Sequence, residues 1–204
     1  MTSYSMMLNI KGRPAVVVGG GKIAYRRTMG LLKAGAKVTV ISPDIQEQMN
    51  DLWNGNRVDW IQKNFEADDL HGAFIVIAAT NDKQVNLSIA ENAGDNQLVN
   101  VVDEPELSTF HVPATLTRGD LTISVATGGA SPTLSRIIRG ELEEKYDNSY
   151  VGYLDFLATV RGKLKQTSLD ESLKIHYLIE ITNESFQKSE EKQQEFLQFL
   201  EEIQ

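Results

Sequence analysis

Over the first half of the chain, nearly continuous apolar runs alternate with segments in which apolar residues recur every three to four positions. The apolar runs are residues 14–18, 36–42, 74–80 and 97–102, with a weaker one at 57–62. Such runs are typical of strands that are covered on both faces of a sheet. The segments 22–34 and 83–94 have helical spacing and lie between runs. This alternation predicts parallel strands joined by right-handed helical crossovers.

The pattern changes after about residue 105. Residues 109–117 and 121–127 have the composition of strands, and only Arg118–Asp120 separate them. So short a connection predicts an antiparallel hairpin. A helix is expected next, because Ser131 can cap its N-terminus and Pro132 suits the first helical position.

The expected fold class is therefore α/β, with a Rossmann-type doubly wound sheet, a small strand–helix segment and a C-terminal helical domain. We expect the boundaries to divide the chain into residues 1–112, 113–148 and 149–204. The last part is expected to be helical because the spacing stays helical from Tyr150 to the end.

A glycine-rich turn connects the first expected strand to the first expected helix. Its sequence, Gly19-Gly20-Gly21-Lys22-Ile23-Ala24, fits the dinucleotide-binding pattern G-x-G-x-x-G/A. Gly19 permits the tight turn, and Gly21 lets a pyrophosphate approach the backbone because no Cβ intervenes. Free N–H groups at the helix N-terminus can then bind the phosphates. We interpret the turn as a dinucleotide site because it opens a strand–helix–strand unit.

The second expected strand ends in Ser42, Pro43 and Asp44. Dinucleotide-binding domains place an acidic residue at this position, where it binds the ribose hydroxyls. Asp44 suits this role, and Ser42 can take part of it. Because none of the three is an arginine that would bind a 2′-phosphate, the sequence favours NAD over NADP.

Two further strands end in polar residues. Thr80 and Asn81 follow one of them, and Asp103 follows the other. Ligands of open α/β sheets bind beyond the carboxyl ends of the strands. Desolvation there can raise the pKa of Asp103 toward the range of a general acid or base, although a turn aspartate that binds local backbone is the alternative. Asn100, inside the apolar strand, either orders a neighbouring turn or faces the cofactor.

A second candidate site is the loop Thr127-Gly128-Gly129-Ala130-Ser131, which leads into the helix after the hairpin. Exposed backbone N–H groups at a helix N-terminus favour anions such as carboxylates. Arg118 precedes this loop, and Arg136 and Arg139 follow it on the helix. An ordinary capped helix with surface arginines is the alternative.

Composition narrows the class of protein. The 204 residues carry a formal net charge of −8, which argues against nucleic acid or an anionic membrane as a partner. The absence of cysteine excludes disulfides, thiolate metal sites and thiol catalysis, and the three histidines are scattered, so no resident metal is expected. No apolar run reaches the roughly 18 residues of a membrane span, and the first residues lack the order of a signal peptide. We expect a soluble, cytoplasmic protein.

Four stretches, in this order, resemble the precorrin-2 dehydrogenase family of sirohaem synthesis: GGGKIAYRR, AATND, NVVDEPELSTFHVPA and SVATGGASPTLSRIIR. The resemblance covers roughly residues 5–145. The family includes stand-alone enzymes and the dehydrogenase/ferrochelatase module of larger sirohaem synthases. The resemblance implies NAD-dependent oxidation of precorrin-2 to sirohydrochlorin. Some members also insert Fe²⁺, and the sequence leaves open whether this chain does.

The resemblance also implies roles for individual residues. The glycine turn with Lys22 and Ile23 would bind NAD, Pro43 and Asp44 would lie beside the adenosine ribose, and Asp103 matches the catalytic aspartate of the family. Residues 113–148 resemble its dimerisation and substrate-binding region, so a homodimer is expected. The residues expected to bind the carboxylates of precorrin-2 are Asn100, Arg118, Thr127, Gly128, Gly129, Ser131 and Arg136.

One departure concerns Ala126-Thr127, where the family often has two serines, so a serine-dependent role there is in doubt. Two other functions stay open. One is an NAD(H)-sensing regulatory module that signals through its helical tail without turnover. The other is a dehydrogenase for a different anionic substrate.

Overall fold

The computed structural model describes residues 3–203, which form two compact units. The first unit extends to Val112, and the second begins at Pro113. The functional division of the chain into three parts stays a prediction.

The first unit is built on a parallel five-stranded sheet with the order β3-β2-β1-β4-β5. Its strands are β1 (Pro14–Val18), β2 (Lys37–Ile41), β3 (Asp59–Ile61), β4 (Ile75–Ala78) and β5 (Leu98–Val101). The connecting elements are α1 (Lys22–Lys33), α2 (Glu47–Asn54), η1 (Ala67–Leu70), α3 (Lys83–Asn92) and η2 (Pro105–Leu107). The strand order reverses between β1 and β4, which is the point where open α/β sheets bind their ligands.

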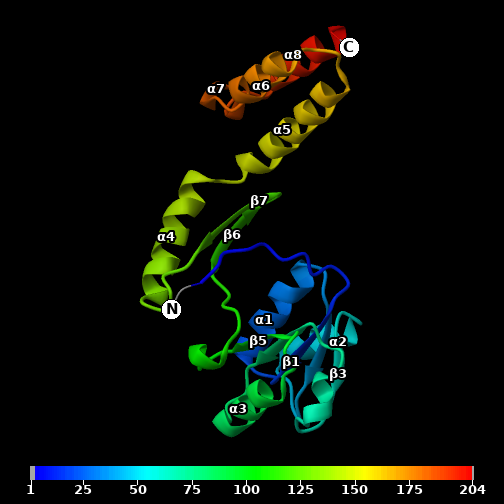
Figure 1. Ribbon diagram of the computed structural model, residues 1–204, viewed down its shortest axis with the longest axis vertical. Coiled ribbons are helices and arrows are strands. Elements are labelled where there is room, and N and C mark those ends of the chain that lie inside the picture. The colour runs from blue at the N-terminus through cyan, green and yellow to red at the C-terminus, as the bar shows by residue number, and fades with distance from the viewer. Residues whose placement is uncertain (1–2, 204) are drawn as a thin grey trace. The chain divides into compact units, whose positions relative to one another are not determined.

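Both faces of this sheet are buried (Figure 1). Ala15 and Val17 of β1 pack on the face covered by α1 and α2, whereas Val16 and Val18 pack on the face of α3 and η1. Because alternate residues of each strand enter one core or the other, most positions of these strands are apolar. The structure therefore confirms the predicted doubly wound sheet and the reason for its continuous apolar runs. The helix α2, which buries Met49, was not assigned from the sequence.

The second unit begins with the antiparallel hairpin of β6 (Ala114–Arg118) and β7 (Leu121–Val125). The hairpin is confirmed, but two details of the prediction were wrong. The first strand begins at Ala114 rather than at residue 109. Arg118 pairs with Leu121 inside the ladder, so the turn is Gly119-Asp120, and Gly119 has a φ of +55° that glycine adopts without strain.

Helices make up the rest of this unit. They are α4 (Pro132–Lys145), α5 (Ser149–Gln166), α6 (Glu171–Glu180), α7 (Glu184–Gln187) and α8 (Glu190–Glu202). Ser131 caps α4 by accepting a hydrogen bond from the N–H of Leu134 at 3.1 Å, as predicted. The core of the last four helices is aromatic and aliphatic, and it joins Phe156 of α5 to Phe196 and Leu200 of α8.

Candidate cofactor and catalytic site

The three glycines between β1 and α1 meet different surroundings. Gly19 has a φ of +122°, and a Cβ on it would lie 2.4 Å from the carbonyl oxygen of Ala79. A Cβ on Gly20 would lie 1.9 Å from the carbonyl oxygen of Asp44. A Cβ on Gly21 would meet no protein atom within 4 Å. The protein's own packing therefore requires Gly19 and Gly20, whereas Gly21 borders open space.

This open space lies at the N-terminus of α1. Gly21 is the N-cap residue, and its carbonyl accepts the hydrogen bond from the N–H of Tyr25 at 3.0 Å. No side chain caps this helix end, and its first turn contains no acidic residue. Lys22 and Ile23 are exposed beside it. Backbone N–H groups and the positive end of the helix dipole thus face a cradle that fits a pyrophosphate.

The turn after β2 is held by hydrogen bonds to its backbone. The Ser42 hydroxyl donates to the carbonyl of Asp44 at 2.6 Å, and the indole N–H of Trp60 donates to the carbonyl of Ser42 at 3.0 Å. The Gln62 amide donates to the carbonyl of Pro43 at 3.0 Å. Ser42 is buried and shapes the turn, whereas the side chains of Pro43 and Asp44 are exposed. Asp44 is thereby fixed close to the glycine turn.

The turn after β4 is held by a residue that sequence reasoning missed. Asn86 of α3 is 2% exposed and accepts hydrogen bonds from the N–H of Thr80 at 3.2 Å and from its hydroxyl at 2.8 Å. Its own amide donates to the carbonyl of Thr80 at 3.1 Å. Asn81 stays exposed at the end of this turn. The available signal was an amide on the buried face of an otherwise amphipathic segment.

Asp103 lies in the turn after β5, as the sequence predicted, but its side chain is exposed. The chain by itself therefore leaves this carboxylate in contact with solvent, because the short turn carries it out beyond the sheet. Asn100 is 4% exposed, and its amide donates to the carbonyl of Phe110 at 3.1 Å. This bond fits the ordering role that the sequence left open for Asn100.

The glycine loop before α4 belongs to the second unit. Gly128 and Gly129 have φ values of +60° and +86°, a conformation that favours glycine. The hydroxyl of Thr127 accepts hydrogen bonds from the N–H of Ser131 at 3.1 Å and from the hydroxyl of Ser135 at 3.2 Å. Threonine therefore retains a hydroxyl that stabilises this loop, in spite of the departure at Ala126.

The three arginines near this loop have different environments. Arg118 is half-buried and donates to the carbonyl of Thr117 at 3.0 Å. Arg139 forms an ion pair with Glu143 at 3.2 Å, whereas Arg136 is exposed. Of the residues predicted to bind the substrate, Asn100 lies in the first unit and all the others lie in the second.

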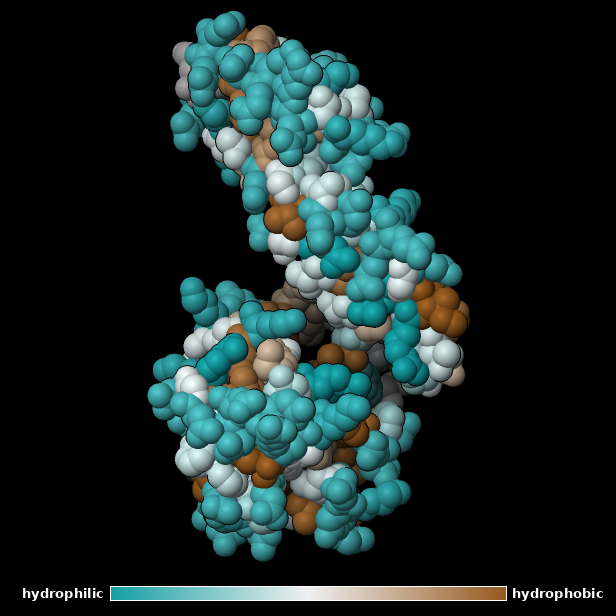
Figure 2. Space-filling model, turned by 180° about the vertical axis from the view of Figure 1, so that it is seen from behind, coloured by the Kyte–Doolittle hydropathy of each residue, from teal (hydrophilic) through white to brown (hydrophobic). Residues whose placement is uncertain are grey.

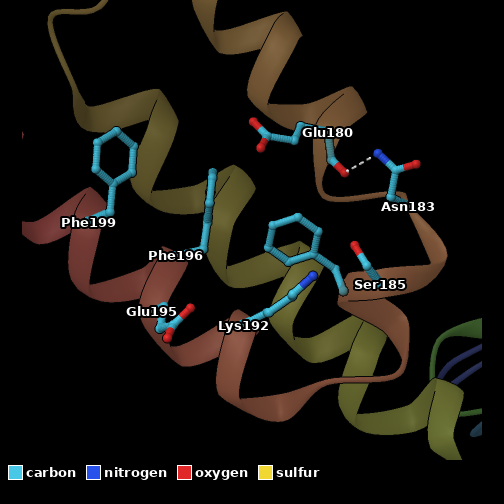
Figure 3. Close-up of a pocket in the computed structure, with 8 residues that line it drawn as sticks. Glu180, Asn183, Ser185, Lys192, Glu195, Phe196 and Phe199 are labelled. Atoms are coloured by element: carbon cyan, nitrogen blue, oxygen red, sulfur yellow. Dashed lines mark hydrogen bonds between the residues drawn. The ribbon is translucent and has the colours of Figure 1, made fainter.

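A surface cavity of about 460 Å³ lies elsewhere, among the C-terminal helices (Figure 3). Phe186, Phe196 and Phe199 form its apolar wall. Its polar rim consists of Glu180, Asn183, Ser185, Lys192 and Glu195. None of the residues predicted from the sequence to bind cofactor or substrate lines it.

Within residues 3–203, no group of three or more His, Cys, Asp or Glu side chains is placed to hold a metal ion. Among the helices that the structure describes, none is long and apolar enough to cross a membrane.

Three models of known protein families match successive segments of this chain. A family model described as putative NAD(P)-binding matches residues 6–114, one described as sirohaem biosynthesis protein central matches 118–145, and the SirC C-terminal domain matches 150–196. The precorrin-2 dehydrogenase of Priestia megaterium is 36% identical over 198 residues, which cover 97% of this chain and 98% of that protein. The chain belongs to the precorrin-2 dehydrogenase family.

Other members of the precorrin-2 dehydrogenase family support this assignment. The precorrin-2 dehydrogenase of Bacillus subtilis is 33% identical over 76% of this chain and 96% of its own length. The siroheme synthase of Methylobacillus flagellatus is 38% identical, and the match covers 81% of this chain but 36% of that longer protein. A solved structure of SirC, precorrin-2 dehydrogenase, has a TM-score of 0.87 and 36% identity, with 98% of this chain and 100% of that one covered.

Proposed function

We propose that this chain catalyses the NAD-dependent dehydrogenation of precorrin-2 to sirohydrochlorin in sirohaem biosynthesis. The observation that carries this proposal is the glycine cradle at the N-terminus of α1, in a chain that matches a precorrin-2 dehydrogenase over nearly the full length of both proteins. A regulatory NAD(H) sensor would share the cradle, so turnover distinguishes the two functions.

The cofactor would be held by the turns described above. The glycine turn, Lys22 and Ile23 would bind the pyrophosphate, and Asp44 would accept hydrogen bonds from the adenosine ribose. NAD is favoured over NADP because a 2′-phosphate would be repelled by the exposed carboxylate of Asp44. Thr80 and Asn81 would border the nicotinamide end. When bound, NAD⁺ supplies the acceptor for the hydride.

Dehydrogenation removes one hydride and one proton from the substrate. Because the hydride leaves with the cofactor, the proton needs an acceptor on the protein. We assign this role to the carboxylate of Asp103, which stands at the carboxyl end of β5 and is exposed for contact with a ligand. The exposed side chain of Arg136 and the N–H groups of the loop before α4 are suited to bind the substrate carboxylates.

The proposal is tested by an anaerobic assay with the purified chain, precorrin-2 and NAD⁺. We expect NADH absorbance and sirohydrochlorin to rise together, and NADP⁺ to give a slower reaction. If NAD⁺ binds without any NADH formation, the result favours the NAD(H)-sensor function, and the assignment of precorrin-2 as the substrate fails.

The open space at Gly21 predicts a variant that separates binding from folding. In Gly21→Ala the new methyl meets no protein atom, so the melting temperature should stay within about 2 °C of the wild type. The methyl would occupy the proposed pyrophosphate space, and we expect NAD⁺ affinity to fall by about tenfold or more. Quenching of tryptophan fluorescence measures this affinity, because the two tryptophans, Trp53 and Trp60, lie in the first unit. Unchanged affinity would contradict the placement of the pyrophosphate.

Insertion of Fe²⁺ into sirohydrochlorin is a second activity that the sequence leaves open. The macrocycle itself supplies four nitrogen ligands, so the iron, as a substrate, does not require a protein-built metal site. Anaerobic addition of Fe²⁺ to the dehydrogenase product tests this activity through the spectrum of sirohaem.

We also propose that the chain forms a homodimer. Leu134 and Ile137 of α4 are 47% and 54% exposed, and hydrophobic surface is visible over this part of the chain (Figure 2). Apolar side chains exposed on one helix favour contact with another protein surface. Gel filtration with light scattering should give twice the chain mass of 22.7 kDa. A monomer at micromolar concentration would contradict this prediction.

A further inference from the structure

β5 lies at one edge of the parallel sheet and pairs only with β4 among the described strands. On its outer side, the backbone N–H groups of Val99 and Val101 point away from β4. Buried backbone groups on an open edge need partners, since an unpaired one costs free energy.

Two hydroxyl side chains supply those partners. The N–H of Val99 donates to the hydroxyl of Thr109 at 2.8 Å, and the N–H of Val101 donates to the hydroxyl of Ser108 at 2.9 Å. The N–H of Thr109 returns a hydrogen bond to the carbonyl of Val99 at 2.9 Å. Residues 108–110 therefore cover the edge of β5 in place of a sixth strand. This explains why the strand predicted from residue 109 does not begin until Ala114.

The chain between β5 and this cover is a closed turn, and Asp103 lies in it. Val102 anchors one side of the turn, because its N–H donates to the carbonyl of Ala78 at 3.0 Å. On the other side, the hydroxyl of Ser108 lies 3.2 Å from the carbonyl oxygen of Val101 and 3.4 Å from that of Glu104. Ser108 thus contacts the backbone both before and after Asp103.

We propose that Ser108 is a positioning residue for the carboxylate of Asp103 in precorrin-2 dehydrogenation. This inference rests on the proton-accepting role proposed for Asp103. The backbone of the turn sets the direction in which the exposed carboxylate of Asp103 points. A proton acceptor must lie within about 2.6–3.2 Å of its donor, and a misplacement of about 1 Å can lower a rate by up to about 100-fold. The hydroxyl of Ser108 ties together the backbone on the two sides of Asp103 and so helps to hold the turn in place.

Thr109 provides a matched control for Ser108. Its hydroxyl covers the same strand edge with a hydrogen bond of similar length. That bond ends at Val99, farther along the strand from Asp103, and no hydrogen bond joins Thr109 to the turn itself within the described residues. Loss of the Thr109 hydroxyl should weaken the contact of residues 108–110 with the edge of β5 and leave the direction of the Asp103 carboxylate unchanged.

The experiment compares Ser108→Ala with Thr109→Val in the full chain. Both variants should lower the melting temperature by about 2–4 °C, which corresponds to the loss of one hydrogen bond in a chain of this size. Ser108→Ala should lower kcat by about tenfold or more with little change in NAD⁺ affinity, and Thr109→Val should keep kcat within about twofold. Ser108→Thr keeps the hydroxyl and should recover most of the lost rate.

A double variant separates positioning from general destabilisation. In an Asp103→Asn background, Ser108→Ala should cause no further loss of kcat, because the group that Ser108 positions is already gone. Equal losses of kcat in Ser108→Ala and Thr109→Val, or the same loss with Asp103→Asn present, would overturn the inference. If Asp103→Asn alone keeps full turnover, the proposed role of Asp103 also fails. That result is recognised from the single variant, without any change at Ser108.

Discussion

Asp103→Asn is expected to lower kcat for precorrin-2 oxidation by about 100-fold to 1,000-fold, because general acid–base catalysis typically contributes roughly this much. Asparagine keeps the size of the side chain and removes its ability to accept the proton. NAD⁺ affinity should be unchanged, since Asp103 lies in the turn after β5 and not in the glycine cradle. Initial rates of NADH formation measure kcat, and tryptophan fluorescence measures NAD⁺ binding.

Glu106→Gln is the matched control for this variant. Glu106 is exposed in η2 on the same turn, and the substitution removes the same charge. We expect its kcat to stay within about twofold of the wild type. Similar losses in the two variants would show that negative charge on the turn matters rather than a specific proton acceptor, and Asp103 would lose its assignment.

Gly20→Ala is expected to destabilise the first unit by about 3 kcal/mol, in the range of substitutions that force atoms into a packed site. The new Cβ would stand 1.9 Å from the carbonyl oxygen of Asp44 and 2.9 Å from its carbonyl carbon, and backbone atoms cannot move aside as a flexible side chain can. The two turns proposed to hold the cofactor would separate, so NAD⁺ affinity should fall as well. Denaturation followed by tryptophan fluorescence reports on this unit, because Trp53 and Trp60 both lie in it.

Gly30→Ala in α1 provides the control for this second prediction. A Cβ on Gly30 meets no atom within 4 Å outside its own helix, and alanine has the higher helix propensity. We expect a gain of about 0.5–1 kcal/mol in unfolding free energy and no effect on NAD⁺ binding. If Gly20→Ala is as stable as the wild type, then the glycine turn is not packed against the turn after β2.

Much of the first unit could be predicted because its sheet is buried on both faces. Most positions of each strand are then apolar, and each crossover helix carries one apolar face, so the pattern alone reveals the parallel sheet. The glycine turn between the first strand and the first helix could be predicted as well, since a pyrophosphate-binding motif at such a junction has a short, specific glycine spacing. The prediction failed at the hairpin, where residues 109–110 have strand composition and instead cover the edge of β5.

The fold class, the family and the position of the glycine turn could be predicted from the sequence, because these depend on local spacing and on motifs in a fixed order. The packing of the folded chain shows that Gly19 and Gly20 leave no room for a Cβ and that Gly21 borders open space, since this depends on what Ala79 and Asp44 place beside the first two. It also shows that Asp103 is exposed and that Asn86 and Ser108 hold turns of the candidate site. The surroundings of Gly19 and Gly20 arise from contacts between segments far apart in the chain. The hydrogen bonds of Asn86 and Ser108 join residues six and seven positions apart, which the turns of the fold bring together.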